Sequence, residues 1–176
     1  MFPGLWNQGD SGMQITNFKD MYIAELQELV NMEGQLADAL KLTTGIASHA
    51  SLKDLFKKHR LETLQQADRV RSILEKHGAN AQTHTDQAMQ ALIAEADKMA
   101  GILQGDDLRD SGLIASAQKL EHYEIAAYGS AASLAEQLDL RDDQKQLHEI
   151  LQEEQRADRL LSGLAKGEVN QDAAAA

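Results

Sequence analysis

The stretch that decides the fold is AQKLEHYEIAAYGS, residues 117–130. Its apolar and small residues recur at steps of three and four, the spacing of an α-helix with one buried face. Two acids, Glu121 and Glu124, stand on that face, and Tyr128 follows them one turn later. Small residues dominate the middle of the stretch and allow a neighbouring helix to approach closely. This pattern predicts a core helix that turns carboxylates toward the protein interior.

Working outward, the same period marks three other long segments and one shorter segment. N-cap residues, glycines and apolar stripes predict where the long helices begin and end: the first from Thr16 or Asn17 to about Gly45, the second from a capping-box start at Ser51 to His77 with Gly78 beyond it, the third from about Ser111, and the fourth from Asp139 or Arg141 to Gly163. A shorter amphipathic helix, Met89 to Leu103, lies within the connection 78–111. A connection of this length lets the second and third long helices run parallel. We therefore expect an all-α four-helix bundle, residues 16–167, with a long crossover carrying an additional helix, an N-terminal arm, 1–15, and a flexible C-terminal tail, 168–176.

Composition excludes several classes of function. Twenty-eight acids against 17 Lys and Arg give a net charge of −11, which repels phosphate backbones and argues against nucleic acid as a partner. The chain has no cysteine, so disulfides and thiol catalysis are excluded. No apolar run approaches the roughly 18 residues of a membrane span, and no signal peptide is recognisable, so we expect a cytoplasmic protein.

The informative signal is a set of carboxylates on the apolar stripes of all four long helices, each near mid-helix. They are Glu25 on the first, Glu62 on the second, Glu121 and Glu124 on the third, and Glu154 with Asp158 on the fourth. A single acid on such a stripe usually lies at the border and reaches solvent. Acids buried without a partner cost several kcal/mol each, so a cluster must either protonate or bind a cation. Oxygen donors favour a hard metal such as Fe, Mn or Mg.

The helices also resemble a known family. FKDMYIAELQEL, FKKHRLETLQQADRV, AQKLEHYEIAAYGS and LQEEQRADRLL look like the helices of the YciE/YciF-type ferritin-like bacterial stress proteins, in order over about residues 17–165. The resemblance implies a ferritin-like bundle, a homodimer, a two-metal centre and an association with stress responses. It supplies no reaction.

One departure from the ferritin pattern bears on the chemistry. Ferritins and rubrerythrins carry Glu-x-x-His on two helices, but Gln65 and Ala157 stand where those histidines are expected. His59 and Gln66 are candidates to complete or orient the ligand shell.

Three functions remain open at this stage. The chain can be a di-iron protein that handles O₂, H₂O₂ or Fe(II) with oxidase or ferroxidase-like activity, with two Fe per chain and Mn or Mg as alternatives. It can bind metal without turnover. It can also be a metal-free helical dimer that acts as a non-enzymatic stress or interaction protein.

Overall fold

The computed structural model describes residues 15–81 and 84–175, and within these residues every regular element is helical. The elements in chain order are α1 (Phe18–Ile46), α2 (Ala50–Lys76), α3 (Gln87–Ile102), α4 (Asp106–Gln137), α5 (Arg141–Leu164), the π-helix η1 (Ala165–Val169) and α6 (Asn170–Ala175). The all-α prediction is confirmed. The predicted arm, 1–15, lies outside the described residues except for Ile15.

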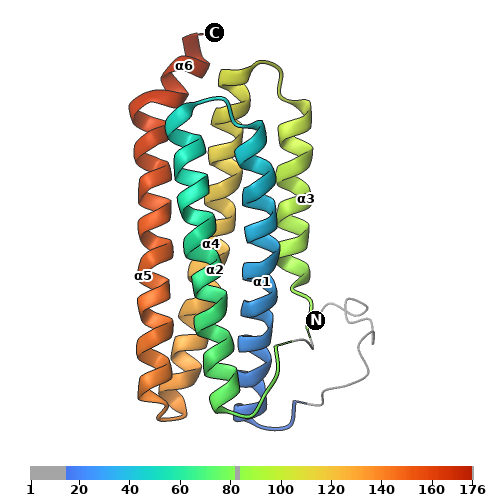
Figure 1. Cartoon of the computed structure of the whole chain (residues 1–176), viewed down its shortest axis with the longest axis vertical. Helices are drawn as coiled ribbons and strands as arrows, with labels where there is room; N and C mark the ends of the chain where they lie inside the picture. The colour runs from blue at the N-terminus through green and yellow to red at the C-terminus, as the bar shows by residue number, and fades with distance from the viewer. Residues whose placement is uncertain (1–14, 82–83, 176) are drawn as a thin grey trace, which may run out of the picture.

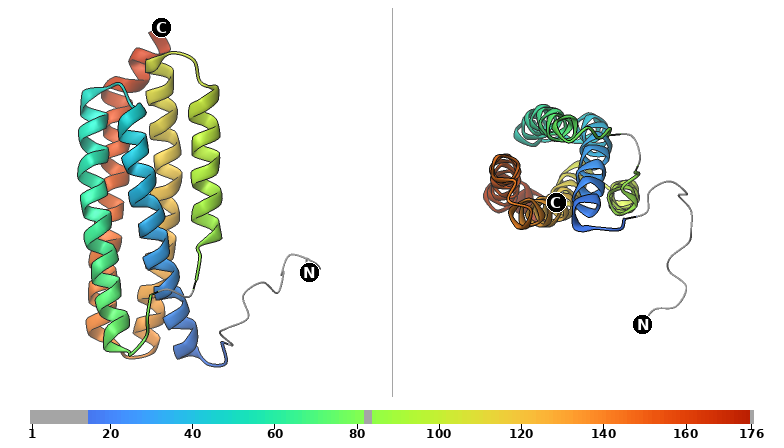
Figure 2. Two further views of the ribbon diagram at one scale, coloured as in Figure 1. Left: turned by 45° about the vertical axis from the view of Figure 1, so that its right-hand side comes forward. Right: turned by 90° about the horizontal axis from the view of Figure 1, so that it is seen from below.

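Two antiparallel hairpins build the bundle. α1 packs mainly on α2, and α4 packs mainly on α5, while α1–α4 and α2–α5 contacts join the two pairs (Figure 1). The connection after α2 travels the length of the bundle through α3, which lies outside α1 and α4, so α2 and α4 run in the same direction (Figure 2). The four-helix bundle with a helical crossover is therefore confirmed.

Local sequence rules located two of the helix ends. Asn17 caps α1, because its side chain accepts a hydrogen bond from the backbone N of Asp20. At the end of α2, Gly78 adopts φ +68° directly after the cap residue His77, and its backbone N donates a hydrogen bond to the Glu75 carbonyl, while the next residue bonds back to Leu74. This pairing is a Schellman motif, which requires the left-handed conformation that glycine adopts without a steric penalty.

The predicted starts at Ser51 and Ser111 are wrong. α2 begins at Ala50, and no side chain of its own first turn caps it. The cap comes from Asp110 of α4 instead, a buried carboxylate that accepts hydrogen bonds from the backbone N atoms of Ser48 (2.9 Å) and His49 (2.6 Å). α4 begins at Asp106, before the predicted start at Ser111, and Asp110 therefore lies in its first turns.

The C-terminal segment that we expected as a flexible tail is helical through Ala175. A π-helix continues α5 and buries Ala165 and Val169, which are one turn apart, and both η1 and α6 contact α4. Apolar contact with α4 therefore extends the helix beyond Gly163 and Gly167, where we expected it to stop.

Aliphatic side chains from all four long helices fill the core at both ends, with Tyr22 and Tyr128 as its largest members. None of the described helices is long and apolar enough to span a membrane. The core is interrupted near mid-height, where acidic side chains replace apolar ones.

Candidate metal centre

Four buried side chains from three helices converge near the middle of the bundle. They are His59 of α2, Glu121 and Glu124 of α4, and Glu154 of α5, and each offers one ligand atom within 4.8 Å of all the others. None of the four is more than 3% exposed. The structure thus brings together three of the predicted acids, and it places His59 in the same group.

Helix geometry explains this convergence. Glu121 and Glu124 are three residues apart and so share one face of α4. Glu154 lies near the middle of α5 and His59 near the middle of α2, and helices of similar length that pack side by side bring their midpoints to one level. The four side chains consequently meet in one layer of the core.

A fourth acid, Glu33 of α1, borders this group and was not predicted. It is fully buried, and Tyr128 of α4 donates a short hydrogen bond from its hydroxyl to Glu33 Oε1. The sequence contained a signal for Glu33, since it lies between Leu29 and Leu36 at steps of four and three, and it is closer to the midpoint of α1 than Glu25 is. All four long helices therefore contribute to the centre, with Glu33 as the residue from α1.

Burial controls the protonation of these acids. It raises the pKa of Glu33 to about 8 from its ordinary 4.5, although the Tyr128 hydroxyl and His59 act in the opposite direction. Burial also raises the pKa of Glu124, with repulsion from Glu154 adding to the effect. The pKa of Glu154 rises for the same reason, with repulsion from Glu33 adding to it. Near neutral pH, the isolated protein therefore holds protons on part of this group.

His59 is the only base inside the group among the described residues. Its Nε2 lies 2.9 Å from Glu121 Oε1, an ion-pair distance, but the two groups are not aligned as a hydrogen bond. Burial lowers the pKa of His59, but the combined interactions with Glu121, Glu62 and Glu154 outweigh this effect, and the net pKa is well above 6.5. The imidazole is therefore positioned by charge and remains available as a ligand once a cation replaces its proton.

Gln66 holds one of the acids from the side. This buried amide donates a short hydrogen bond to Glu154 Oε1 and a second one, 3.1 Å long, to Glu153 Oε2. Glu153 in turn forms a two-pronged ion pair with Arg69 across the boundary between α2 and α5. Gln66 therefore orients a carboxylate of the group, which is the orienting role that the sequence left open for it.

The structure does not bring three predicted residues into the group. Glu25 is eight residues before Glu33, which is about 12 Å along the helix axis, and it is half-buried near Asp86. Glu62 lies on the solvent side of His59, at 3.9 Å from its Nδ1, and this contact lowers the Glu62 pKa. Asp158 accepts a hydrogen bond from Gln118 at the bundle surface.

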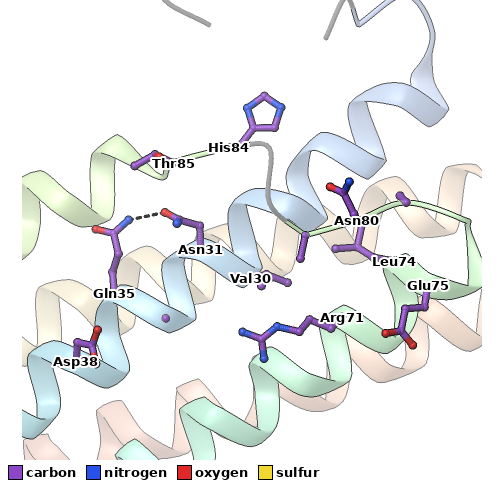
Figure 3. Close-up of a pocket in the computed structure, with 13 residues that line it drawn as sticks. Val30, Asn31, Gln35, Asp38, Arg71, Leu74, Glu75, Asn80, His84 and Thr85 are labelled. Carbon is purple, nitrogen blue, oxygen red and sulfur yellow. Dashed lines mark hydrogen bonds between the residues drawn. The ribbon is translucent and has the colours of Figure 1, made fainter. Parts of the chain in front are cut away.

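A separate hollow of about 1070 Å³ opens between α1, α2 and the connection that precedes α3 (Figure 3). Gln35 donates a hydrogen bond to Asn31 along its edge. Its charged lining combines the acids Asp38 and Glu75 with Arg71, so no single sign of charge dominates. None of the five central residues lines this hollow, and the centre is distinct from it.

The hydrogen-bonding state of the central acids fits a cation. Within the described part of the chain, both carboxylate oxygens of Glu124 lack a hydrogen-bond partner, as does one oxygen each of Glu33, Glu121 and Glu154. Buried polar atoms in folded proteins are nearly always paired, so several unpaired carboxylate oxygens in one part of the core need an explanation. A bound metal ion would pair them all at once.

Comparison with known proteins agrees with the fold. Residues 17–174 match the family described as Domain of unknown function (DUF892). The chain is 37% identical to Protein YciF of Escherichia coli strain K12 over 162 residues, which cover 92% of this chain and 98% of that protein. The crystal structure of the E. coli stress protein YciF superimposes with a TM-score of 0.84 over 89% of this chain and 99% of that one. The structure of YcfI from Rhodopseudomonas palustris is 31% identical in sequence. It superimposes with a TM-score of 0.82 over 85% of this chain and 95% of that one. The chain belongs to the DUF892 family of YciF-like stress proteins and shares its ferritin-like helical bundle.

Proposed function

We propose that this protein is a stress-associated metal protein whose bundle centre binds iron and oxidises Fe(II) with dioxygen or peroxide. One observation carries the proposal, namely the convergence of His59, Glu121, Glu124 and Glu154 with ligand atoms within 4.8 Å of one another. Glu33 borders them and completes a set of four carboxylates and one imidazole. Such a set suits Fe(II), with Mn(II) and Mg(II) as weaker alternatives.

Charge balance supports two ions. Four ionised carboxylates carry four negative charges, and two divalent cations neutralise them without any other base. Arg69, which also acts on Glu33, is already paired with Glu153 and leaves that negative charge largely in place. The proposal therefore assigns two divalent ions to one chain.

The protein side of this centre positions donors and excludes water. Tyr128 holds Glu33, Gln66 holds Glu154, and the ion pair with Glu121 holds His59. Because the donors are already oriented and dry, little reorganisation is needed when a cation replaces the protons. Bound iron supplies a redox couple and a Lewis acid, and two Fe(II) substrate ions provide the two electrons that reduce peroxide to water.

Aerobic titration of chelator-treated protein with Fe(II) tests the proposal. We expect Fe(III) absorbance to form much faster with wild-type protein than in buffer alone, with an end point at two Fe per chain. Glu124→Gln should lose this acceleration. Exchange of the exposed Glu136 for Gln is the matched control and should retain it. Binding without accelerated oxidation would reject the oxidase function, and no binding would reject the metal centre.

A second candidate is supported by the raised pKa values of Glu33, Glu124 and Glu154. Protons alone can neutralise these acids, so the bundle can fold as a metal-free interaction protein. The missing histidines at Gln65 and Ala157 point in the same direction. In that case Fe(II) titration shows neither binding nor oxidation, and the role of the bundle is to present its outer faces to a partner. We propose a second copy of the chain as that partner.

A further inference from the structure

A second group of linked polar side chains lies at the end of the bundle where α1 begins. It is about 21 Å from Glu33 along the axis of α1. Lys19 comes from the first turn of α1, His77 is the C-cap residue of α2, and Asp143 lies in the first turn of α5. Lys19 Nζ is 2.9 Å from His77 Nδ1, and His77 Nε2 is 2.6 Å from Asp143 Oδ2. Three helix ends therefore meet through one imidazole.

The chemistry of the two neighbours fixes where the protons lie. Asp143 is buried, and its Oδ2 also accepts a hydrogen bond of 3.1 Å from the Tyr22 hydroxyl. A carboxylate only accepts, so His77 Nε2 carries a proton and donates it to Asp143. His77 Nδ1 then holds a lone pair and accepts the hydrogen bond that Lys19 Nζ donates. The order carboxylate, imidazole, amine is that of an oriented base next to a nucleophile.

The surroundings of Lys19 allow it to react. Its side chain is partly exposed, so a small reagent can approach. Burial lowers the pKa of Lys19 below 10.5, although the negative charge of Asp143 opposes this effect. The Tyr22 ring, 5.2 Å from Nζ, keeps the amine beside His77. Lys76 Nζ lies 3.9 Å from Asp143 Oδ1. A hollow of about 410 Å³ borders His77, and its lining also carries the charged residues Asp139, Arg141 and Asp142.

We propose that Lys19 is an acyl-acceptor site, at which His77, oriented by Asp143, removes a proton from the amine as it attacks an activated acyl group such as an acyl phosphate. The Lys19 ammonium gives one proton to His77 Nδ1, which returns it to solvent. A bond forms between Nζ and the carbonyl carbon while the bond from that carbon to the phosphate oxygen breaks. Phosphate leaves with the electron pair and takes the second nitrogen proton, and the product is an amide on Lys19.

Acetyl phosphate is the probe for the first test. The full-length protein is incubated with it at neutral pH, and acetylation of each lysine is followed over time by peptide mass spectrometry. Lys76 is the internal reference, because it lies at the same end of the bundle and is 52% exposed but does not contact the imidazole. We expect Lys19 to react at least about tenfold faster than Lys76, a modest part of the 10²-fold or more that a positioned base contributes in enzymes. Equal rates would overturn the proposal, and this comparison needs no variant.

His77→Gln separates a basic role from a positioning role. The Gln amide can still donate to Asp143 and accept from Lys19, but it cannot take up a proton at neutral pH. We expect the Lys19 rate to fall to that of Lys76 while the Lys76 rate stays unchanged. An unchanged Lys19 rate in the variant would show that His77 is not the base. The readout is independent of the metal centre, since it is measured in the presence of a chelator.

Discussion

The raised pKa of Glu33 leads to a prediction about stability and pH in the metal-free protein. A group whose pKa is higher in the folded state stabilises the fold below its unfolded pKa, here 4.5, and this contribution is lost as pH rises through the folded value of about 8. Each pH unit between these limits costs about 1.36 kcal/mol. Raising the pH from 5 to 7 therefore removes about 2.7 kcal/mol through Glu33 alone.

The titratable neighbours of Glu33 change the stability of the fold with pH in the same direction. The pKa values of Glu124, Glu154 and His59 are also raised in the folded protein, so the total loss between pH 5 and 7 exceeds the share of Glu33. Glu33→Gln removes that share and also relieves the repulsion that Glu33 exerts on Glu124 and Glu154. We expect the pH dependence of the variant to be flatter than that of wild type by at least about 2–3 kcal/mol.

Urea unfolding in the presence of a chelator at pH 5, 6 and 7 measures this difference directly. Thermal unfolding should show it as roughly 5–10 °C between the two pH values in a chain of this size. Glu136→Gln, at an exposed position, serves as the control and should follow wild type at every pH. Parallel curves for Glu33→Gln and wild type would refute the reasoning, as would a wild-type protein that is no less stable at pH 7 than at pH 5.

Three further predictions concern the centre, one helix cap and the assembly. Fe(II) or Mn(II) at about 100 times its Kd should stabilise wild type by about 2.7 kcal/mol. The double variant Glu121→Gln, Glu124→Gln should be more stable than wild type without metal and should gain no stability from metal. Full metal stabilisation of this variant would show that α4 does not contribute ligands to the site. Asp110→Ala should cost about 1–3 kcal/mol in urea unfolding, because it leaves the backbone N–H groups of Ser48 and His49 without their acceptor, and a loss below about 0.5 kcal/mol would contradict this. Light scattering at tens of micromolar should give twice the chain mass of 19.3 kDa, and a monomer would disprove the proposed homodimer.

The fold could be predicted because its determinants are local. Apolar stripes at helical spacing located all five main helices, and the length of the crossover fixed the parallel course of α2 and α4. The ends were harder to predict where the cap is distant in sequence. Asp110 caps α2 from another helix, and no rule that reads neighbouring residues can find it.

The site could be predicted only in part, because α1 is apolar over more than one face. The residue predicted from this helix, Glu25, is half-buried, whereas the fully buried residues of α1 include Leu26, Glu33 and Leu36. α1 contacts α2, α3 and α4, so apolar residues surround much of the helix and do not define one phase. Glu154 was identifiable because α5 carries its buried residues on one face, and the two acids of α4 because they recur at helical spacing with the buried Ala117 and Tyr128.

The two-hairpin construction has a consequence for how the chain folds. The α1–α2 hairpin holds Glu33 and His59, while the α4–α5 hairpin holds the other three acids of the centre. Neither hairpin alone assembles the complete cluster, so the full electrostatic penalty arises only when the two halves dock. Docking should therefore be the step that slows at alkaline pH, and a cation present during refolding should accelerate that step and leave hairpin formation unchanged.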